Sequence, residues 1–161
     1  MSALGELVDR AAIADVVAGL AHAQDDQDWD ALRRLFADEV VLDLSTHHFG
    51  RPPATLAAAE LVTLARNTLQ GFDCTHHATS NPDVLVSGDE ARCRVHVVAY
   101  HHVPAEPGVV DHCTMRGCWR LELRRTGERW LITQWVVQRT CPWEGSPDVY
   151  ALAAQRSPAT S

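Results

Sequence analysis

Two long stretches of alternating side chains restrict most strongly how this chain can fold. In residues 91–101, and again in residues 113–123, the odd-numbered positions carry an apolar set that includes Val95, Val97, Trp119 and Leu121. The even-numbered positions are mostly polar or charged. Successive side chains of a strand point to opposite faces of a sheet, so this pattern predicts strands with one buried and one polar face. Turn sequences at 87–89 and 126–128 divide residues 71–138 into a β-meander.

The first seventy residues show the spacing of helices instead. Apolar residues recur at helical intervals over residues 5–24, Asp28 is expected to cap a short helix over 29–37, and a third helix ends at Gly71. Residues 40–44 predict a short strand. The sequences Arg51-Pro52-Pro53 and Asn81-Pro82 are expected to break the chain.

These elements predict an α+β fold, with three N-terminal helices packed on one face of a curved antiparallel sheet. We expect residues 1–145 to form a single domain. Residues 146–161, rich in proline and small side chains, are expected to fray as a tail or to wrap a neighbouring subunit.

Composition excludes several classes of function. The net charge of −7 argues against nucleic acid and anionic membranes as partners, and no apolar run approaches the ~20 residues of a membrane span. The start of the chain lacks a secretion signal, and the five cysteines form no Cys-x-x-Cys pair, so we expect a reduced, cytoplasmic protein. All fourteen basic residues are arginine, which excludes Schiff-base chemistry on lysine. No nucleotide-binding glycine motif occurs, so no cofactor is expected.

Three residues are the candidates for chemistry: Asp25 at the end of the first helix, His77 where a strand begins, and His101 at the end of the strand 91–101. The alternation directs His101 inward and His102 outward. A carboxylate that orients one imidazole, with a second imidazole nearby, can move protons on carbon. Each residue also has a structural interpretation, as a solvated helix-end carboxylate or as a hydrogen-bonded strand histidine.

Metal binding is the competing interpretation of the nine histidines. Three adjacent pairs occur, His47-His48, His76-His77 and His101-His102. Neighbours on a strand face opposite ways and rarely bind the same ion, and no His-x-His or His-Glu-x-x-His spacing occurs, so we expect no metal site.

Short motifs carry a resemblance to a known family. Arg10-Ala11-Ala12-Ile13 followed by Asp25, and then the stretches 27–32, 75–77 and 114–117, are similar to the SnoaL-like branch of the nuclear-transport-factor-2-like superfamily. Within that branch, the chain resembles scytalone dehydratases and hexachlorocyclohexane dehydrochlorinases. The resemblance implies a cone-shaped α+β barrel with a deep pocket between the helices and the sheet.

The resemblance also implies roles. Asp25 matches the catalytic aspartate, His77 the general base and His101 a second pocket histidine. The polar substrate-binding residues of the two families are replaced in this chain. Two tyrosines of the dehydratases correspond to Gln24 and Leu44, and their pocket serine and asparagine correspond to positions near Leu121 and Leu123. The pocket lysine of the dehydrochlorinases corresponds to Leu20.

The function expected is that of a cofactor-independent lyase that dehydrates a small apolar or polyketide-like molecule of secondary metabolism through an Asp–His dyad. An isomerase, cyclase or hydrolase using the same pocket, or a non-catalytic ligand-binding or assembly protein, remain the alternatives. The outward positions Val98 and Tyr100 are more apolar than a free sheet face usually is, and together with the resemblance they predict a homo-oligomer, a trimer ahead of a dimer.

Overall fold

The computed structural model describes residues 2–47 and 50–156. The elements along the chain are α1 (Ala3–Asp25), α2 (Trp29–Arg33), β1 (Phe36–Leu44), β2 (Arg51–Ala57), α3 (Ala58–Leu69), β3 (Cys74–Ser87), β4 (Glu90–His102), β5 (His112–Thr126), β6 (Arg129–Arg139), β7 (Glu144–Gly145) and α4 (Val149–Arg156). No helix in these described ranges is long and apolar enough to cross a membrane.

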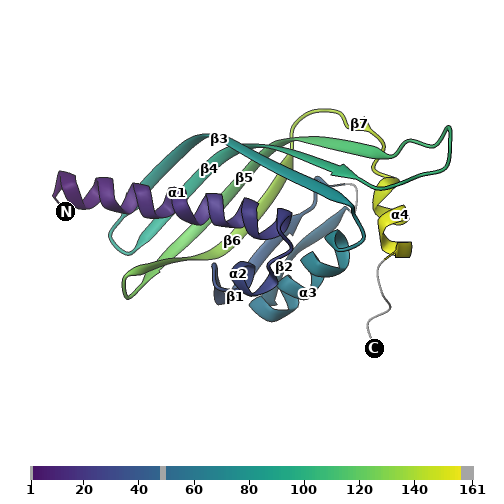
Figure 1. Cartoon of the computed structure of the whole chain (residues 1–161). Coiled ribbons are helices and arrows are strands. Elements are labelled where there is room, and N and C mark those ends of the chain that lie inside the picture. The colour runs from purple at the N-terminus through teal and green to yellow at the C-terminus, as the bar shows by residue number, and fades with distance from the viewer. Residues whose placement is uncertain (1, 48–49, 157–161) are drawn as a thin grey trace.

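One curved, open sheet forms the body of the protein (Figure 1). Its strand order is β2-β1-β6-β5-β4-β3, with β7 paired to β5. The strands from β3 to β6 form the predicted antiparallel meander, whereas β1 runs parallel to β6. Helix α1 crosses one face of the sheet (Figure 1). The α+β class and the three helices before the meander are confirmed.

The predicted alternation decides which face the helices cover. Odd-numbered residues of β4 and β5, such as Val95, Val97 and Trp119, are almost fully buried, whereas Arg92 and Arg120 are exposed. The buried set continues into α1, α3, β1 and β6 and makes one apolar core. The hydrophobic effect therefore holds α1 against the inner face of the sheet.

Polar contacts fix the N-terminal half of α1 to the sheet. The buried carboxylate of Asp9 accepts hydrogen bonds from Arg125 Nη2 at 2.6 Å and from Trp130 Nε1 at 3.3 Å. Arg10 Nη1 donates to the carbonyl oxygen of Val84 at 2.6 Å. Because these partners lie on β3, β5 and β6, the contacts set the position of α1 along the sheet.

The two proline-containing breaks are the first difference from the sequence prediction. Arg51-Pro52-Pro53 lies within β2, and Asn81-Pro82 forms a bulge inside a continuous β3. Both strands are at the ends of the main strand order, and an edge strand tolerates a residue without an N–H donor. The second helix is also shorter than expected, because Phe36 turns into the core as the first residue of β1.

The tail is the second difference. Residues 149–156 form α4, which neither frays nor extends away from the domain. Val149, Tyr150 and Ala153 are buried in a second apolar cluster with Leu69, Phe72, Val103 and Cys113. Gly71 allows this packing, because a Cβ atom there would lie 1.9 Å from the carbonyl oxygen of Ala153. Residues 157–161 of the expected tail lie outside the described residues.

Candidate active site

The end of α1 places the candidate aspartate. The amide of Asp28 donates to the carbonyl of Ala23, and the amide of Gln27 donates to that of Gln24. Gln27 has a φ of 53°, in the left-handed region. These features form a Schellman motif, which stops the helix directly after Asp25 and leaves its side chain beside β3.

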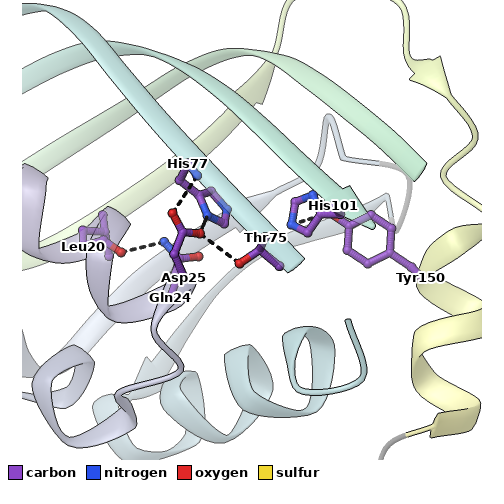
Figure 2. A network of polar contacts seen from close by, with 7 residues as sticks. All are labelled: Leu20, Gln24, Asp25, Thr75, His77, His101 and Tyr150. Carbon is purple, nitrogen blue, oxygen red and sulfur yellow. Dashed lines mark hydrogen bonds and ion pairs between the residues drawn. The ribbon is translucent and has the colours of Figure 1, made fainter. Parts of the chain in front are cut away.

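Asp25 contacts the first residues of β3 with both carboxylate oxygens (Figure 2). Oδ1 lies 2.6 Å from His77 Nδ1 and accepts a hydrogen bond from the Thr75 hydroxyl at 2.9 Å. Oδ2 accepts from the backbone N–H of His77 at 2.8 Å. The predicted contact between Asp25 and His77 is therefore present, and it fixes both the ring and the backbone of the histidine.

Strand pairing brings His101 to the same place. His77 pairs with Ala99 and Thr75 pairs with His101, so residues 77 and 101 lie diagonally on one face of neighbouring strands. The ring centroids of His77 and His101 are 5.3 Å apart, and both residues are buried. His76 is exposed and the side chain of His102 is one-third exposed. The structure thus selects His77 over His76, which the sequence pattern left open.

The pKa values of Asp25 and His101 are both lower than their ordinary values. Burial alone would raise the pKa of Asp25, but hydrogen bonds from the ring and backbone of His77, its charge and the Thr75 hydroxyl outweigh burial and hold that pKa below its ordinary value. Burial lowers the pKa of His101 well below its ordinary value, and the charges of His77 and His47 lower it further. At neutral pH, Asp25 is therefore an anion and the imidazole of His101 is uncharged.

A cavity of about 90 Å³ lies against these residues. His77, His101, Gln24 and Thr68 face it among an apolar majority from α3, β1, β5 and β6, including Leu42, Leu61, Leu64, Met115, Trp119 and Val137. Among the described lining residues there is no arginine, aspartate or glutamate. The cavity therefore suits an uncharged, largely apolar molecule.

In the described ranges, no three His, Cys, Asp or Glu side chains are grouped as they would be to bind a metal ion. Of the adjacent histidine pairs, His48 lies outside the described residues.

Three further polar side chains in the cavity were not predicted as functional. Tyr150 projects from α4 toward His101 (Figure 2), and its hydroxyl lies 3.5 Å from His101 Nε2 and 3.4 Å from His47 Nε2. Trp135 also lines the cavity, and its buried indole N–H has no hydrogen-bond partner among the described residues. Helical spacing of Val149, Tyr150 and Ala153 was the available signal for α4, and prolines on either side obscured it.

An α+β fold with an apolar cavity between helices and sheet is the architecture implied by the sequence resemblance. Residues 5–136 match the SnoaL-like domain family. The chain belongs to this family, so the expected membership of the SnoaL-like branch is confirmed. No curated protein matches the chain significantly in sequence.

Solved structures share the fold over nearly the whole chain. The Kfla4162 protein from Kribbella flavida is 26% identical, with a TM-score of 0.82 over 92% of this chain and 98% of that one. A proposed aromatic ring hydroxylase from Novosphingobium aromaticivorans is 28% identical, with a TM-score of 0.76 over 89% and 97%. A type 2 hexachlorocyclohexane dehydrochlorinase, LinA, is 19% identical, with a TM-score of 0.74 over 90% and 93%.

Proposed function

We propose that this protein is a cofactor-independent enzyme that performs acid–base chemistry on a small, uncharged organic molecule. The observation that carries the proposal is the 2.6 Å contact between Asp25 Oδ1 and His77 Nδ1 at the wall of an apolar cavity. A carboxylate held beside one ring nitrogen of a histidine is the arrangement that makes the opposite nitrogen a base.

The first step is removal of a proton from carbon. Asp25 accepts the Nδ1–H of His77, so the lone pair of Nε2 takes the proton from a carbon beside a carbonyl group. The resulting imidazolium is stabilised by the anion of Asp25. General base catalysis of this kind contributes roughly 10²–10⁴-fold in rate. The apolar walls exclude water, which strengthens the electrostatic interaction between the two groups.

The second step decides between dehydration and isomerisation. For dehydration, the C–H electrons form the new C=C bond, the C–O bond of a β-hydroxyl breaks, and the hydroxyl leaves as water with the proton held by His77. His101 hydrogen-bonds to the departing hydroxyl. We assign His101 this role because burial lowers its pKa, which makes its cation an uncommon species at neutral pH.

Dehydration is our first choice because this chain resembles dehydratases and because the fold is shared with an enzyme named for elimination of hydrogen chloride. An isomerase is the second candidate, since a pocket without a charged acid can return the proton to another carbon of the same molecule. Cyclisation or hydrolysis in this pocket, or non-catalytic binding of the same ligands, are outcomes that the following experiment separates.

The test is turnover of a panel of cyclic β-hydroxy ketones, followed by the ultraviolet absorbance of the conjugated enone and by mass loss of one water. We expect His77→Ala to abolish turnover and His76→Ala, the exposed neighbour on the opposite face, to leave the rate within about twofold. Equal rates for wild type and His77→Ala would sink the acid–base proposal. Binding of the panel without any reaction in the wild type would favour the non-catalytic alternative.

A further inference from the structure

Part of the cavity lining is a chain of neighbouring aromatic and imidazole rings. Ring centroids lie 5.7 Å apart for Trp135 and Trp119, 5.8 Å for Trp119 and His77, and 5.2 Å for His101 and Tyr150. With the 5.3 Å between His77 and His101, these contacts join Trp135 to Tyr150 in one chain of neighbouring rings that includes the candidate base. Each of these two residues brings one uncharged hydrogen-bond donor.

The indole N–H of Trp135 is the first donor. Trp135 is 6% exposed, lines the cavity, and has no partner for Nε1 among the described residues. Buried polar groups in folded proteins are almost always hydrogen-bonded, and an unpaired one is costly. The ring itself is fixed, because it packs edge-on against Trp119 and lies 6.0 Å from Phe36. A ligand oxygen in the cavity would supply the missing acceptor.

The hydroxyl of Tyr150 is the second donor. Its contacts with His47 and His101, at 3.4 and 3.5 Å, are longer than the ~2.8 Å typical of hydroxyl hydrogen bonds. Because Tyr150 lines the cavity, its hydroxyl can donate a hydrogen bond to a ligand oxygen there. Burial raises the pKa of Tyr150 well above its ordinary value, so the hydroxyl keeps its proton at neutral pH.

The position of Tyr150 is set by the packing of α4. Phe72 meets its ring edge-on at 5.2 Å, Arg156 forms an ion pair with Asp73 at 2.7 Å, and Gly71 lets the helix approach the chain closely. The helix thus presents the hydroxyl to the cavity as a fixed group.

We propose that Trp135 and Tyr150 are the substrate-anchoring residues of this cavity, and that they select an uncharged ring compound by donating hydrogen bonds to its oxygen atoms. The assignment of the reacting carbon rests on the proposed function, because His77 is part of the chain of ring contacts that joins the two anchors. Since no arginine or lysine is among the described lining residues, a carboxylate ligand would have no permanently charged partner there.

The experiment is calorimetric titration with two rings of equal size, cyclohexanone, which accepts hydrogen bonds, and methylcyclohexane, which does not. The readout is the ratio of their dissociation constants. The free energy of burying the ring is similar for the two ligands, so it largely cancels in this ratio. We expect Trp135→Phe and Tyr150→Phe each to weaken the binding of cyclohexanone relative to that of methylcyclohexane. In the double variant the ratio of the two dissociation constants should change by about three- to tenfold, the equivalent of one lost hydrogen bond. Phenylalanine keeps an aromatic ring at both positions, so the cavity stays lined.

Matched controls are Tyr100→Phe, which changes the only other tyrosine, on the outer face of β4, and Trp29→Phe, which lies outside the cavity lining. Both should leave the ratio unchanged. An unchanged ratio in the double variant would overturn the proposal, as would binding of cyclohexanecarboxylate at pH 7 as tight as that of cyclohexanone. The titration does not depend on turnover, so the two proposals can fail separately. If the double variant shows the expected change in the ratio while His77→Ala keeps full activity, the proposed function is rejected and the anchoring role of Trp135 and Tyr150 is kept.

Discussion

Asp25 makes three contacts with its two oxygens, and all three go to the first residues of β3. Its role is therefore both to hold the strand and to orient the imidazole of His77. An asparagine at this position keeps the size and the acceptor oxygen but loses the charge. The two effects of the carboxylate can be separated by this substitution.

We predict that Asp25→Asn lowers the turnover number by roughly 10- to 100-fold, less than His77→Ala does, because the base remains but its imidazolium loses the anion that stabilises it. Steady-state kinetics on the active member of the panel measure this. The control is His102→Ala, at the outward position of β4, which should retain the parent rate. A parent-like rate in Asp25→Asn would mean that the carboxylate serves only the backbone of β3.

At the scale of elements, the contact between Asp9 and Arg125 ties α1 to β5. The hydrogen bond from Arg125 lowers the pKa of Asp9, with a further hydrogen bond from Trp130, against the opposing effect of burial. A carboxyl whose pKa is lower in the folded state contributes stability above its unfolded pKa of ~3.9, and this contribution is lost as the pH falls through the folded value.

We therefore predict that Asp9→Asn lowers the midpoint of thermal unfolding at pH 7, and that the gap to the wild type narrows as the pH falls below about 4. Circular dichroism at a series of pH values measures both midpoints. Asp15→Asn, at an exposed position of the same helix, is the control and should follow the wild type. If the difference in midpoint between the wild type and Asp9→Asn stays constant from pH 7 to pH 3, the charge of Asp9 does not contribute to the stability of the fold.

Two glycines test how closely the elements pack. A Cβ atom at Gly71 would meet the Ala153 carbonyl oxygen at 1.9 Å, whereas one at Gly19 in α1 would meet Leu35 at 3.4 Å, an ordinary contact. We predict that Gly71→Ala destabilises the fold by ~1–3 kcal/mol, because α4 must move. Gly19→Ala should stabilise it by up to ~1 kcal/mol through helix propensity. Urea unfolding measures both, and equal effects of the two substitutions would contradict the close packing of α4.

At the scale of the whole molecule, the outer face of the sheet presents apolar groups beside its arginines. Leu85 and Val98 are 66% and 39% exposed, and Tyr100 is half-buried on the same face. We predict that this face joins copies of the chain, as a trimer ahead of a dimer, because apolar surface of this kind is usually covered.

Light scattering at micromolar concentration gives the molar mass that tests this assembly. Val98→Glu should shift the protein toward the monomer, since it places a charge in the joined face. Val110→Glu, at a similarly exposed valine between β4 and β5, is the control and should leave the mass unchanged. A wild-type protein of monomer mass would refute the prediction.

The sequence by itself determined the elements whose signal is local. Period-two alternation specified the inner face of β4 and β5 and directed His101 inward, and helical spacing with the cap at Asp28 specified α1 and the start of α2. Such features depend on neighbours within a few residues, which the sequence contains directly. The resemblance added the pairing of Asp25 with His77, which no spacing between them could reveal.

Tertiary structure alone decided what depends on distant neighbours. The pairing of His77 with Ala99 chose His77 over His76, and edge positions let Pro52 and Pro82 enter strands. The short segment of α4 gained its place from burial against Leu69 at the end of α3, Phe72, Val103 and Cys113 of β5, which brought Tyr150 to the cavity. Register, edge position and the packing of a short helix are set by contacts across the chain, and these contacts exist only once the core has formed.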